Sequence, residues 1–387
     1  MSSFPNQLLF NSTPRAKLRI LDTLSVNGGE IKHTNHSPYN KDRYVTNRTS
    51  PHKSPMKFDI SNVQTHNGTT GSRGGTPIKS RHFNYSDKIL DAPNLIDAPP
   101  NKIIDFSDDE KMVVALGSSV YLWKDGEVDT LLDAQSQIDS LCWVGNFVAV
   151  SSTGNIEIWD PDLSTVIACL PSHEGRCGAL ASIGNRISTG GSDGIINITD
   201  VKTKRTDRIL GHTSEIISMS WSLDGVYLAS ADIEGQLFVW GGQKKKIFQI
   251  DEQISSITWM GSSFIVIACQ DEDGTIYVLN PNTDSIVKRF QTSSPVSCIR
   301  WSEDIGFYVS HRGGPFEWDV YSKDFVKIQS FPGHSSDIIA ITITKTGKTI
   351  ATLGNDETIR LWEISEKNAS RSCSPFKYTS PFSTSLR

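Results

Sequence analysis

Residues 211–240 read GHTSEIISMSWSLDGVYLASADIEGQLFVW, and this stretch contains the unit from which most of the chain is built. Short apolar runs that alternate with polar residues between Gly and Asp turns are typical of strands. We expect three strands in this stretch, at Ile216–Trp221, Tyr227–Ala231 and Gln236–Trp240, and a fourth just after it, at Ile247–Ile250. The Leu223-Asp-Gly-Val226 turn joins the first two, so the stretch predicts a small antiparallel sheet.

The closing strand of this unit occurs seven times between residues 101 and 366, each time ending in Trp or in a residue that takes its place. The closings are Val-Tyr-Leu-Trp123, Ile-Glu-Ile-Trp159, Ile-Asn-Ile-Thr199, Leu-Phe-Val-Trp240, Ile-Tyr-Val-Leu279, Pro-Phe-Glu-Trp318 and Ile-Arg-Leu-Trp362. Successive closings are 36, 40, 41, 39, 39 and 44 residues apart. A period of about 40–45 residues with Gly-His and Trp punctuation is typical of WD repeats. The sequence therefore predicts an all-β, seven-bladed WD-repeat β-propeller.

Histidine and acidic residues recur at fixed places before the closings. His212 and His334 each follow a Gly and precede their Trp by 28 residues. The acidic residues six places before a closing are Asp193, Asp273, Asp356 and, in the fourth blade, Glu234. In this repeat such His, Asp and Trp side chains usually form a buried hydrogen-bonded set that braces a turn. We expect them to be structural.

The seventh repeat lacks an outer strand. Its three expected strands are Ile338–Thr344, Thr349–Leu353 and Ile359–Ile364. A ring left open there would expose bare strand edges, which proteins avoid. Lys88-Ile-Leu-Asp-Ala-Pro93 is the apolar segment available just before the first repeat. We expect residues 88–93 to complete blade 7, so that the propeller spans residues 88–366 and its ends meet between blades 1 and 7.

Both flanking segments have a different composition. Residues 1–87 and 367–387 are rich in Ser, Thr, Asn, Gly and Pro, which predicts disordered tails. Residues 1–88 hold 13 basic and 5 acidic residues, whereas the remainder holds 25 basic and 38 acidic ones. The basic residues of the tail are scattered without interleaved aromatic residues, so we expect no nucleic-acid binding.

Several functional classes have no signal in the chain. There is no phosphate-binding loop, zinc-ligand spacing or nucleophile elbow, and the six cysteines form no Cys-x-x-Cys pair. The chain shows no apolar run behind a basic start and no long apolar stretch, so we expect neither secretion nor a membrane span. We expect a non-enzymatic protein of the nucleus and cytoplasm that has no cofactor, no metal and no membrane partner.

The order of short motifs resembles one family. Lys88–Pro93, Asn94-Leu-Ile-Asp97 and Val120-Tyr-Leu-Trp123 resemble the Fizzy/Fizzy-related family, the coactivators of the anaphase-promoting complex, a ubiquitin ligase. Gly191–Asn197 and Asn355–Trp362 are similar to the family's third and seventh blades. The resemblance implies a propeller that brings substrates to the ligase.

Two tail motifs extend the resemblance. Asp42-Arg-Tyr-Val-Thr-Asn-Arg48 is similar to the family's C-box, Asp-Arg-Tyr-Ile-Pro-x-Arg, which docks on the ligase. The matching residues are Asp42, Arg43, Tyr44, Val45 and Arg48, and Thr46 departs from the pattern by replacing Pro. The final Leu386-Arg387 resembles the family's Ile-Arg tail, a second docking point. Two tethers on one body would reinforce each other through effective concentration.

The resemblance also implies a degron site. The family holds the destruction box, Arg-x-x-Leu, between blades 1 and 7, where acidic residues pair with its Arg. The matching positions here are Asp105 and Glu357, and two carboxylates suit a guanidinium. We expect them to face one groove. The family's receptor for Lys-Glu-Asn degrons fits poorly, because Ile233 and Gly235 replace Asn and Asp337 replaces Arg. We expect weak or absent recognition of that degron.

The tails carry kinase motifs. Ser/Thr-Pro-x-Lys, the preference of cyclin-dependent kinases, begins at Ser50, Ser54, Thr76 and Ser374. A phosphate at Ser50 or Ser54 would add about −1.5 to −2 charge close to Arg48. We expect phosphorylation to inhibit docking on the ligase.

Together these motifs favour a coactivator of the anaphase-promoting complex. Its expected partners are subunits of that complex, destruction-box substrates such as cyclins or securin-like proteins, and a cyclin-dependent kinase. The alternatives are a WD-repeat scaffold outside the ubiquitin system, a catalytic propeller, and a degenerate family member or inhibitor that docks on the ligase but delivers no substrate. The sequence leaves the substrates and a mitotic or meiotic role open.

Overall fold

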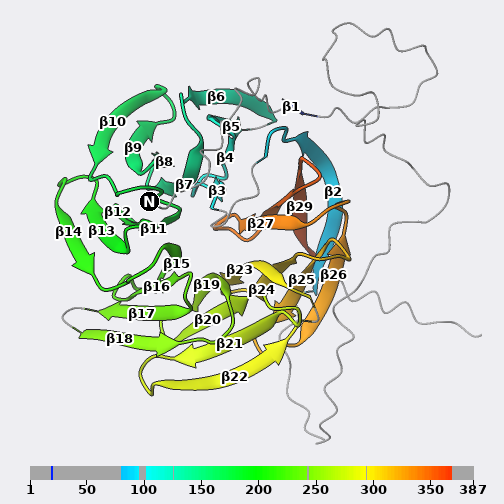
Figure 1. Cartoon of the computed structure of the whole chain (residues 1–387). Coiled ribbons are helices and arrows are strands. Elements are labelled where there is room, and N and C mark those ends of the chain that lie inside the picture. Colours follow the sequence, from blue (N-terminus) through cyan, green and yellow to red (C-terminus); the bar gives the residue numbers. More distant parts are fainter. Residues whose placement is uncertain are drawn as a thin grey trace, which may run out of the picture.

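The computed structural model describes residues 19–20, 80–95, 102–124, 126–241, 244–292 and 294–367. Within these ranges all regular elements are β-strands, and they form seven antiparallel sheets. Figure 1 shows the sheets arranged as the blades of a ring, which confirms the predicted seven-bladed propeller. Most of both predicted tails lies outside the described residues. In the described part of the chain, no helix is long and apolar enough to cross a membrane.

The first six blades are four-stranded meanders in which the chain runs from the centre of the ring to its rim (Figure 1). The inner strands are β3 (Ile104–Phe106), β7 (Ile138–Val144), β11 (Ala179–Ile183), β15 (Ile216–Trp221), β19 (Ile254–Met260) and β23 (Val296–Ser302). The second strands are β4 (Met112–Leu116), β8 (Phe147–Ser152), β12 (Arg186–Gly190), β16 (Leu228–Asp232), β20 (Phe264–Cys269) and β24 (Gly306–His311). The third strands are β5 (Ser119–Lys124), β9 (Asn155–Asp160), β13 (Ile195–Asp200), β17 (Gln236–Gly241), β21 (Thr275–Asn280) and β25 (Glu317–Ser322). The outer strands are β6 (Glu127–Asp133), β10 (Thr165–Leu170), β14 (Thr206–Leu210), β18 (Lys244–Gln249), β22 (Ser285–Gln291) and β26 (Lys327–Pro332).

Blade 7 combines the two ends of the ring. Its strands from the centre outwards are β27 (Ile338–Ile343), β28 (Thr349–Gly354), β29 (Thr358–Lys367), β2 (Ser80–Asp91) and the short β1 (Arg19–Ile20). Strand β2 pairs antiparallel with β29, with Lys88 opposite Leu361 and Asp91 opposite Thr358. The expected closing segment, residues 88–93, therefore lies against the last strand. The strand itself begins earlier, at Ser80, and ends at Asp91.

Burial falls from the centre of the ring to the rim. All residues of β7 are buried, whereas nearly all of β22 is exposed. An inner strand is covered on both faces because each blade packs between two others, so most of its residues are apolar or hydroxylic. The charged exceptions include Asp105, Asp139 and Arg300. One continuous core cluster joins blades 7 and 1, and it includes Leu90, Leu361 and Leu132.

Among the described residues, buried histidines pair with aspartates in four blades, and the pair in blade 6 is His311 with Asp319 at 3.0 Å. In blade 7, His334 lies 3.0 Å from Asp356 and 2.9 Å from the Thr352 hydroxyl, which also accepts from the Trp362 indole N–H at 2.9 Å. Burial lowers the pKa of His334. Burial opposes the lowered pKa of Asp356, but hydrogen bonds and the charge of His334 outweigh it. The set is structural, as expected.

The fourth and fifth blades depart from the expected pattern. His212 pairs with Asp232 at 2.7 Å, and not with Glu234. Asp232 also caps the turn, because its carboxylate accepts the backbone N–H groups of Glu234 and Gln236. In blade 5, Asp273 accepts from the side chain of Gln291 and pairs with no histidine. The prediction that Glu234 and Asp273 belong to buried histidine sets was therefore wrong.

Blade 3 has a histidine set that the Gly-His pattern misses. His173 lies 3.0 Å from Asp193 and 2.8 Å from the Thr189 hydroxyl. Ser172 precedes His173 where blades 4 and 7 have Gly. The sequence signal that could have identified His173 is its position twenty residues before Asp193, the same spacing as between His212 and Asp232.

Candidate functional site

The boundary between blades 7 and 1, here called the seam, is where both ends of the ring meet. Each inner strand begins on one face of the ring, called the upper face, and ends on the other, called the lower face. Buried Leu90 and Ala92 of the incoming segment pack in the cluster that blades 7 and 1 share. The seam is therefore closed by apolar packing as well as by the β2–β29 ladder.

Polar contacts join the two blades on the lower face. The Lys345 ammonium lies 2.8 Å from a carboxylate oxygen of Asp108, and the Thr346 hydroxyl donates to Glu110 at 2.6 Å. Both contacts connect the turn after β27 with the turn after β3. Sequence reasoning missed them, because their partners are 236–237 residues apart and no local pattern relates them.

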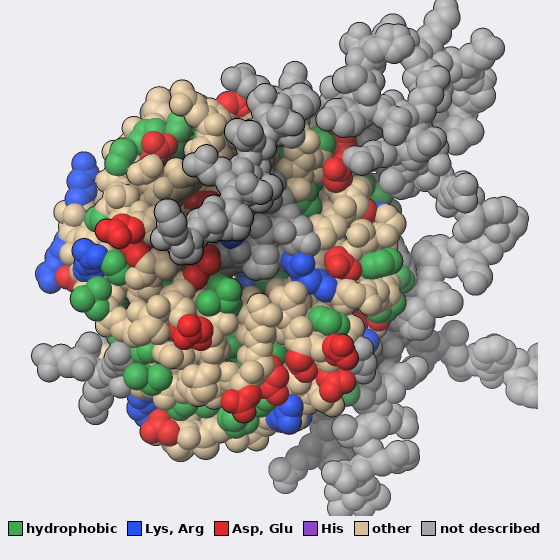
Figure 2. All heavy atoms as spheres, in the orientation of Figure 1, with side chains coloured by type: hydrophobic (Ala, Val, Ile, Leu, Met, Phe, Trp, Pro, Cys, Tyr) green, Lys and Arg blue, Asp and Glu red, His purple; other side chains and the backbone are tan. Residues whose placement is uncertain are grey.

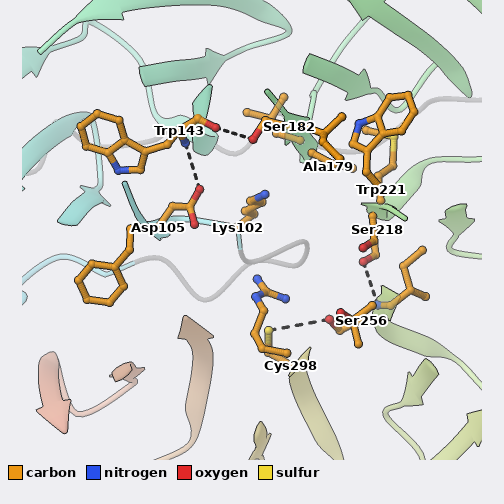
Figure 3. Close-up of a pocket in the computed structure, with 18 of the residues that line it drawn as sticks. Lys102, Asp105, Trp143, Ala179, Ser182, Ser218, Trp221, Ser256 and Cys298 are labelled. Carbon is orange, nitrogen blue, oxygen red and sulfur yellow. Dashed lines mark hydrogen bonds between the residues drawn. The ribbon is translucent and has the colours of Figure 1, made fainter. Parts of the chain in front are cut away.

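Asp105 lies on the inner strand β3, where it faces the central channel. A cavity of about 510 Å³ runs along this channel and is lined by Asp105 and Lys102 among others. Figure 3 shows Asp105 in this cavity, with its carboxylate accepting the backbone N–H of Trp143 from blade 2 at 3.0 Å. This contact ties the inner strands of blades 1 and 2 together.

Glu357 lies in the turn between β28 and β29, on the upper face. Its carbonyl accepts the N–H of Ala92 at 2.7 Å, and its side chain is partly buried. Asp105 pairs with Val113, close to the turn that leads to the lower face. The two carboxylates therefore lie at opposite ends of their blades. The expectation that Asp105 and Glu357 face one groove is wrong, because strand order places them on opposite faces of the ring.

The positions matched to the Lys-Glu-Asn receptor lie on the upper face. Ile233 is 49% exposed in the turn before β17, and Gly235 follows it. Asp337 is engaged, because one of its carboxylate oxygens accepts the N–H of Gly313 at 2.9 Å. None of these three residues has the side-chain amide or guanidinium that the family's Lys-Glu-Asn receptor uses.

The described residues that line the channel are mostly apolar or hydroxylic. The lining of the cavity is rich in hydroxyl groups such as those of Ser182, Ser218 and Ser256, and no histidine occurs among its described lining residues (Figure 3). Burial raises the pKa of the Cys142 and Cys177 thiols to about 12, so they stay protonated at neutral pH. Across the described ranges, no group of three or more His, Cys, Asp or Glu could hold a metal ion.

The surface carries mixed charge. On the face shown in Figure 2, acidic side chains are spread over the described surface, and Lys and Arg do not form one continuous basic patch. The remaining predicted site residues lie outside the described ranges. These are Asp42, Arg43, Tyr44, Val45, Arg48, Ser50, Ser54, Thr76, Ser374, Leu386 and Arg387.

Comparisons with known proteins agree with the fold and extend it. A family model described as WD domain, G-beta repeat, matches residues 203–241 and 325–363, and one described as anaphase-promoting complex subunit 4 WD40 domain matches residues 227–304. Protein FIZZY-RELATED 1 of Arabidopsis thaliana is 30% identical over 324 residues, which cover 76% of this chain and 67% of that protein. Anaphase-promoting complex subunit cdc20 of Dictyostelium discoideum is 29% identical over 304 residues, or 73% of this chain and 60% of that protein.

A solved structure shares the architecture. A chain in the crystal structure of the Mitotic Checkpoint Complex matches with a TM-score of 0.68 and 23% sequence identity, over 78% of this chain and 99% of that one. This likeness concerns the fold. The chain spans 60% to 67% of the length of the two relatives named above.

Proposed function

Because the chain belongs to the Fizzy/Fizzy-related family of WD-repeat proteins, we propose that it is a substrate-recruiting coactivator of the anaphase-promoting complex. The observation that carries the proposal is the 30% identity to Protein FIZZY-RELATED 1 across 67% of that protein. The related protein of Dictyostelium discoideum is named as a subunit of the anaphase-promoting complex. In this role the ring is a binding body and catalyses no reaction itself.

The chain ends supply the proposed contacts with the ligase. Arg43 and Arg48 flank Tyr44 and Val45, a combination of charged forks and an apolar anchor that suits docking on a protein surface. The final Leu386-Arg387 offers an aliphatic side chain and a guanidinium. Deleting these last two residues should weaken co-purification with the complex, and undiminished recovery of the shortened chain would contradict this contact.

Destruction-box substrates are the proposed cargo, and the seam is the proposed place of binding. Glu357 supports this, because its turn lies at the seam beside Ala92. Asp105 is left out of the site, since its carboxylate holds the Trp143 N–H in the channel. We expect Glu357→Ala to weaken binding of a destruction-box peptide. Glu363→Ala is a suitable control, because this exposed carboxylate lies in the middle of β29, away from the turn that holds Glu357.

A ubiquitination reaction tests the function. Purified anaphase-promoting complex without a coactivator is mixed with this chain and a destruction-box substrate, and parallel reactions use a substrate whose box Arg and Leu are replaced by Ala. The proposal predicts that the chain stimulates ubiquitination of the intact substrate alone. Suppression of a reaction driven by another coactivator would instead identify an inhibitor, and failure to associate with the complex would leave a scaffold of another system.

A further inference from the structure

A short strand from far upstream lies on the outside of blade 7. Strand β1 pairs antiparallel with β2, with Arg19 opposite Asp91 and Ile20 opposite Leu90. It also lies beside β6, the outer strand of blade 1. Figure 1 shows β1 at the rim where blades 7 and 1 meet. The other described blades end at their fourth strand, so the edge of β2 is the one that has received an additional strand.

The sequence around β1 has the pattern of a two-sided strand. In Arg15-Ala-Lys-Leu-Arg-Ile20, basic residues alternate with Ala, Leu and Ile. Residues directly opposite one another in an antiparallel pair occupy the same face. A strand continued upstream from β1 in this register would carry its aliphatic residues on the face of Leu90 and its basic residues on the face of Asp91.

The rim that receives this strand has exposed acidic side chains next to buried aliphatic ones. Strand β6 carries exposed acidic residues, and its Leu131 and Leu132 are buried in the shared core. The acidic residues at this rim are Asp91, Glu127, Asp129 and Asp133. Three basic residues within five positions of the incoming segment complement them, and opposite charges across strands favour pairing.

The same segment contains the pattern of a degron. Arg15-Ala-Lys-Leu18 reads Arg-x-x-Leu, as a destruction box does. We propose that residues 15–20 dock on the free edge of β2 as a pseudosubstrate strand and compete with destruction-box peptides for the seam. This inference rests on the proposed function only in its second half, since the docking itself concerns one chain. The antiparallel direction would lead the strand from Arg19 along Ala92 towards the Glu357 turn.

The covalent link between residues 15–20 and the ring raises the local concentration of this segment at the seam. Fifty-nine residues separate Ile20 from Ser80. A chain of that length with the Ser-, Thr- and Gly-rich composition typical of linkers has a root-mean-square span of roughly 40–45 Å. The corresponding effective concentration is on the order of 1 mM. If the free segment has a Kd of about 0.1 mM, the tethered copy weakens the apparent affinity for a competing peptide about tenfold.

Binding of a fluorescent peptide with the sequence of residues 13–23 to the full chain tests the docking. The Arg19→Pro/Ile20→Pro variant should bind this peptide about tenfold more tightly than the unmodified chain, because proline removes the backbone donors that a strand needs. The control Ser25→Pro/Val26→Pro should bind it as the unmodified chain does. Equal affinities for all three chains would overturn the proposal.

A crosslink provides a measurement in the intact chain. Directly opposite residues approach within disulfide distance, so Arg19→Cys/Asp91→Cys should form an internal disulfide under mild oxidation. The control Ser25→Cys/Asp91→Cys should remain largely reduced, and equal crosslinking of both variants would overturn the pairing.

A labelled destruction-box peptide separates this inference from the proposed function. Tighter binding of both peptides to the proline variant supports a pseudosubstrate. Tighter binding of the chain's own peptide alone, with no affinity for the destruction-box peptide in any chain, would retain the docking and reject both the pseudosubstrate role and the proposed degron site.

Discussion

Replacing Leu90 by Ala should weaken the whole ring, because this side chain lies in the strand that closes it. Leu90 is 1% exposed and packs in the core cluster shared by blades 7 and 1. The neighbouring Ile89 is opposite Arg360 in the same ladder but is only partly buried. The two residues thus offer a matched pair of truncations, one into the seam core and one outside it.

The magnitude follows from burial. Truncating a fully buried Leu to Ala destabilises a protein by about 2–5 kcal/mol, and a site enclosed by two blades has little room to collapse. We expect about 3–4 kcal/mol for Leu90→Ala and about 1 kcal/mol for Ile89→Ala. Since domains have about 5–15 kcal/mol of total stability, the first change removes a large share of it.

Urea unfolding followed by tryptophan fluorescence measures the difference, because Trp318 and Trp362 are buried. With a urea dependence of about 3 kcal/mol per molar, Leu90→Ala should lower the midpoint by about 1 M. Ile89→Ala should lower it by about a third of that. A Leu90→Ala midpoint equal to that of Ile89→Ala would refute the reasoning, since the closing strand would then be dispensable for the ring.

Three further outcomes are expected. Replacing Arg43 and Arg48 together by Ala should reduce co-purification with the anaphase-promoting complex at least tenfold, because two charge-assisted contacts are lost, and unchanged recovery would reject the docking motif. Ser50→Asp/Ser54→Asp should weaken the same association through repulsion at the docking site, whereas Ser50→Ala/Ser54→Ala should not, so equal recovery of both would count against the switch. The pKa of Asp356 is lowered in the folded chain, so its stabilising effect is complete above the unfolded pKa of about 4 and is lost as the pH falls below it. Urea midpoints measured from pH 7 to pH 3 should therefore decline less for Asp356→Asn than for the unmodified chain, and parallel declines would disprove this contribution.

The fold could be predicted because its determinants are local and repeated. A strand that ends at Trp240 in one blade has its counterpart at Trp362, and each needs only its own turn residues and apolar alternation to form. The closing role predicted for residues 88–93 followed from a missing strand in blade 7 together with the apolar character of that segment. The additional pairing from Ser80 onwards had no such signal, because most residues of that part of β2 are polar.

The paired acidic site could not be predicted because position along a strand does not reveal the face on which a residue lies. Asp105 and Glu357 each match an acidic position of the family, yet one lies near the lower end of an inner strand and the other in an upper turn. Sequence similarity matched Asp105 and Glu357 to the family one at a time and carried no information about the distance between them. Their relation depends on how far each lies along its blade, and that depends on the register between strands and blades.

The seam differs physically from the other six blade boundaries, and this gives its edge two roles. Strand β2 closes the ring through its pairing with β29 on one side and offers backbone groups on the other, where β1 lies. A peptide that binds this edge only in the folded ring stabilises the ring through mass action, by about 2.7 kcal/mol at a hundred times its Kd. That gain is close to the loss expected for Leu90→Ala. Occupancy of the seam and integrity of the propeller are therefore coupled through one strand, so a docked partner would strengthen the closure on which its own site depends.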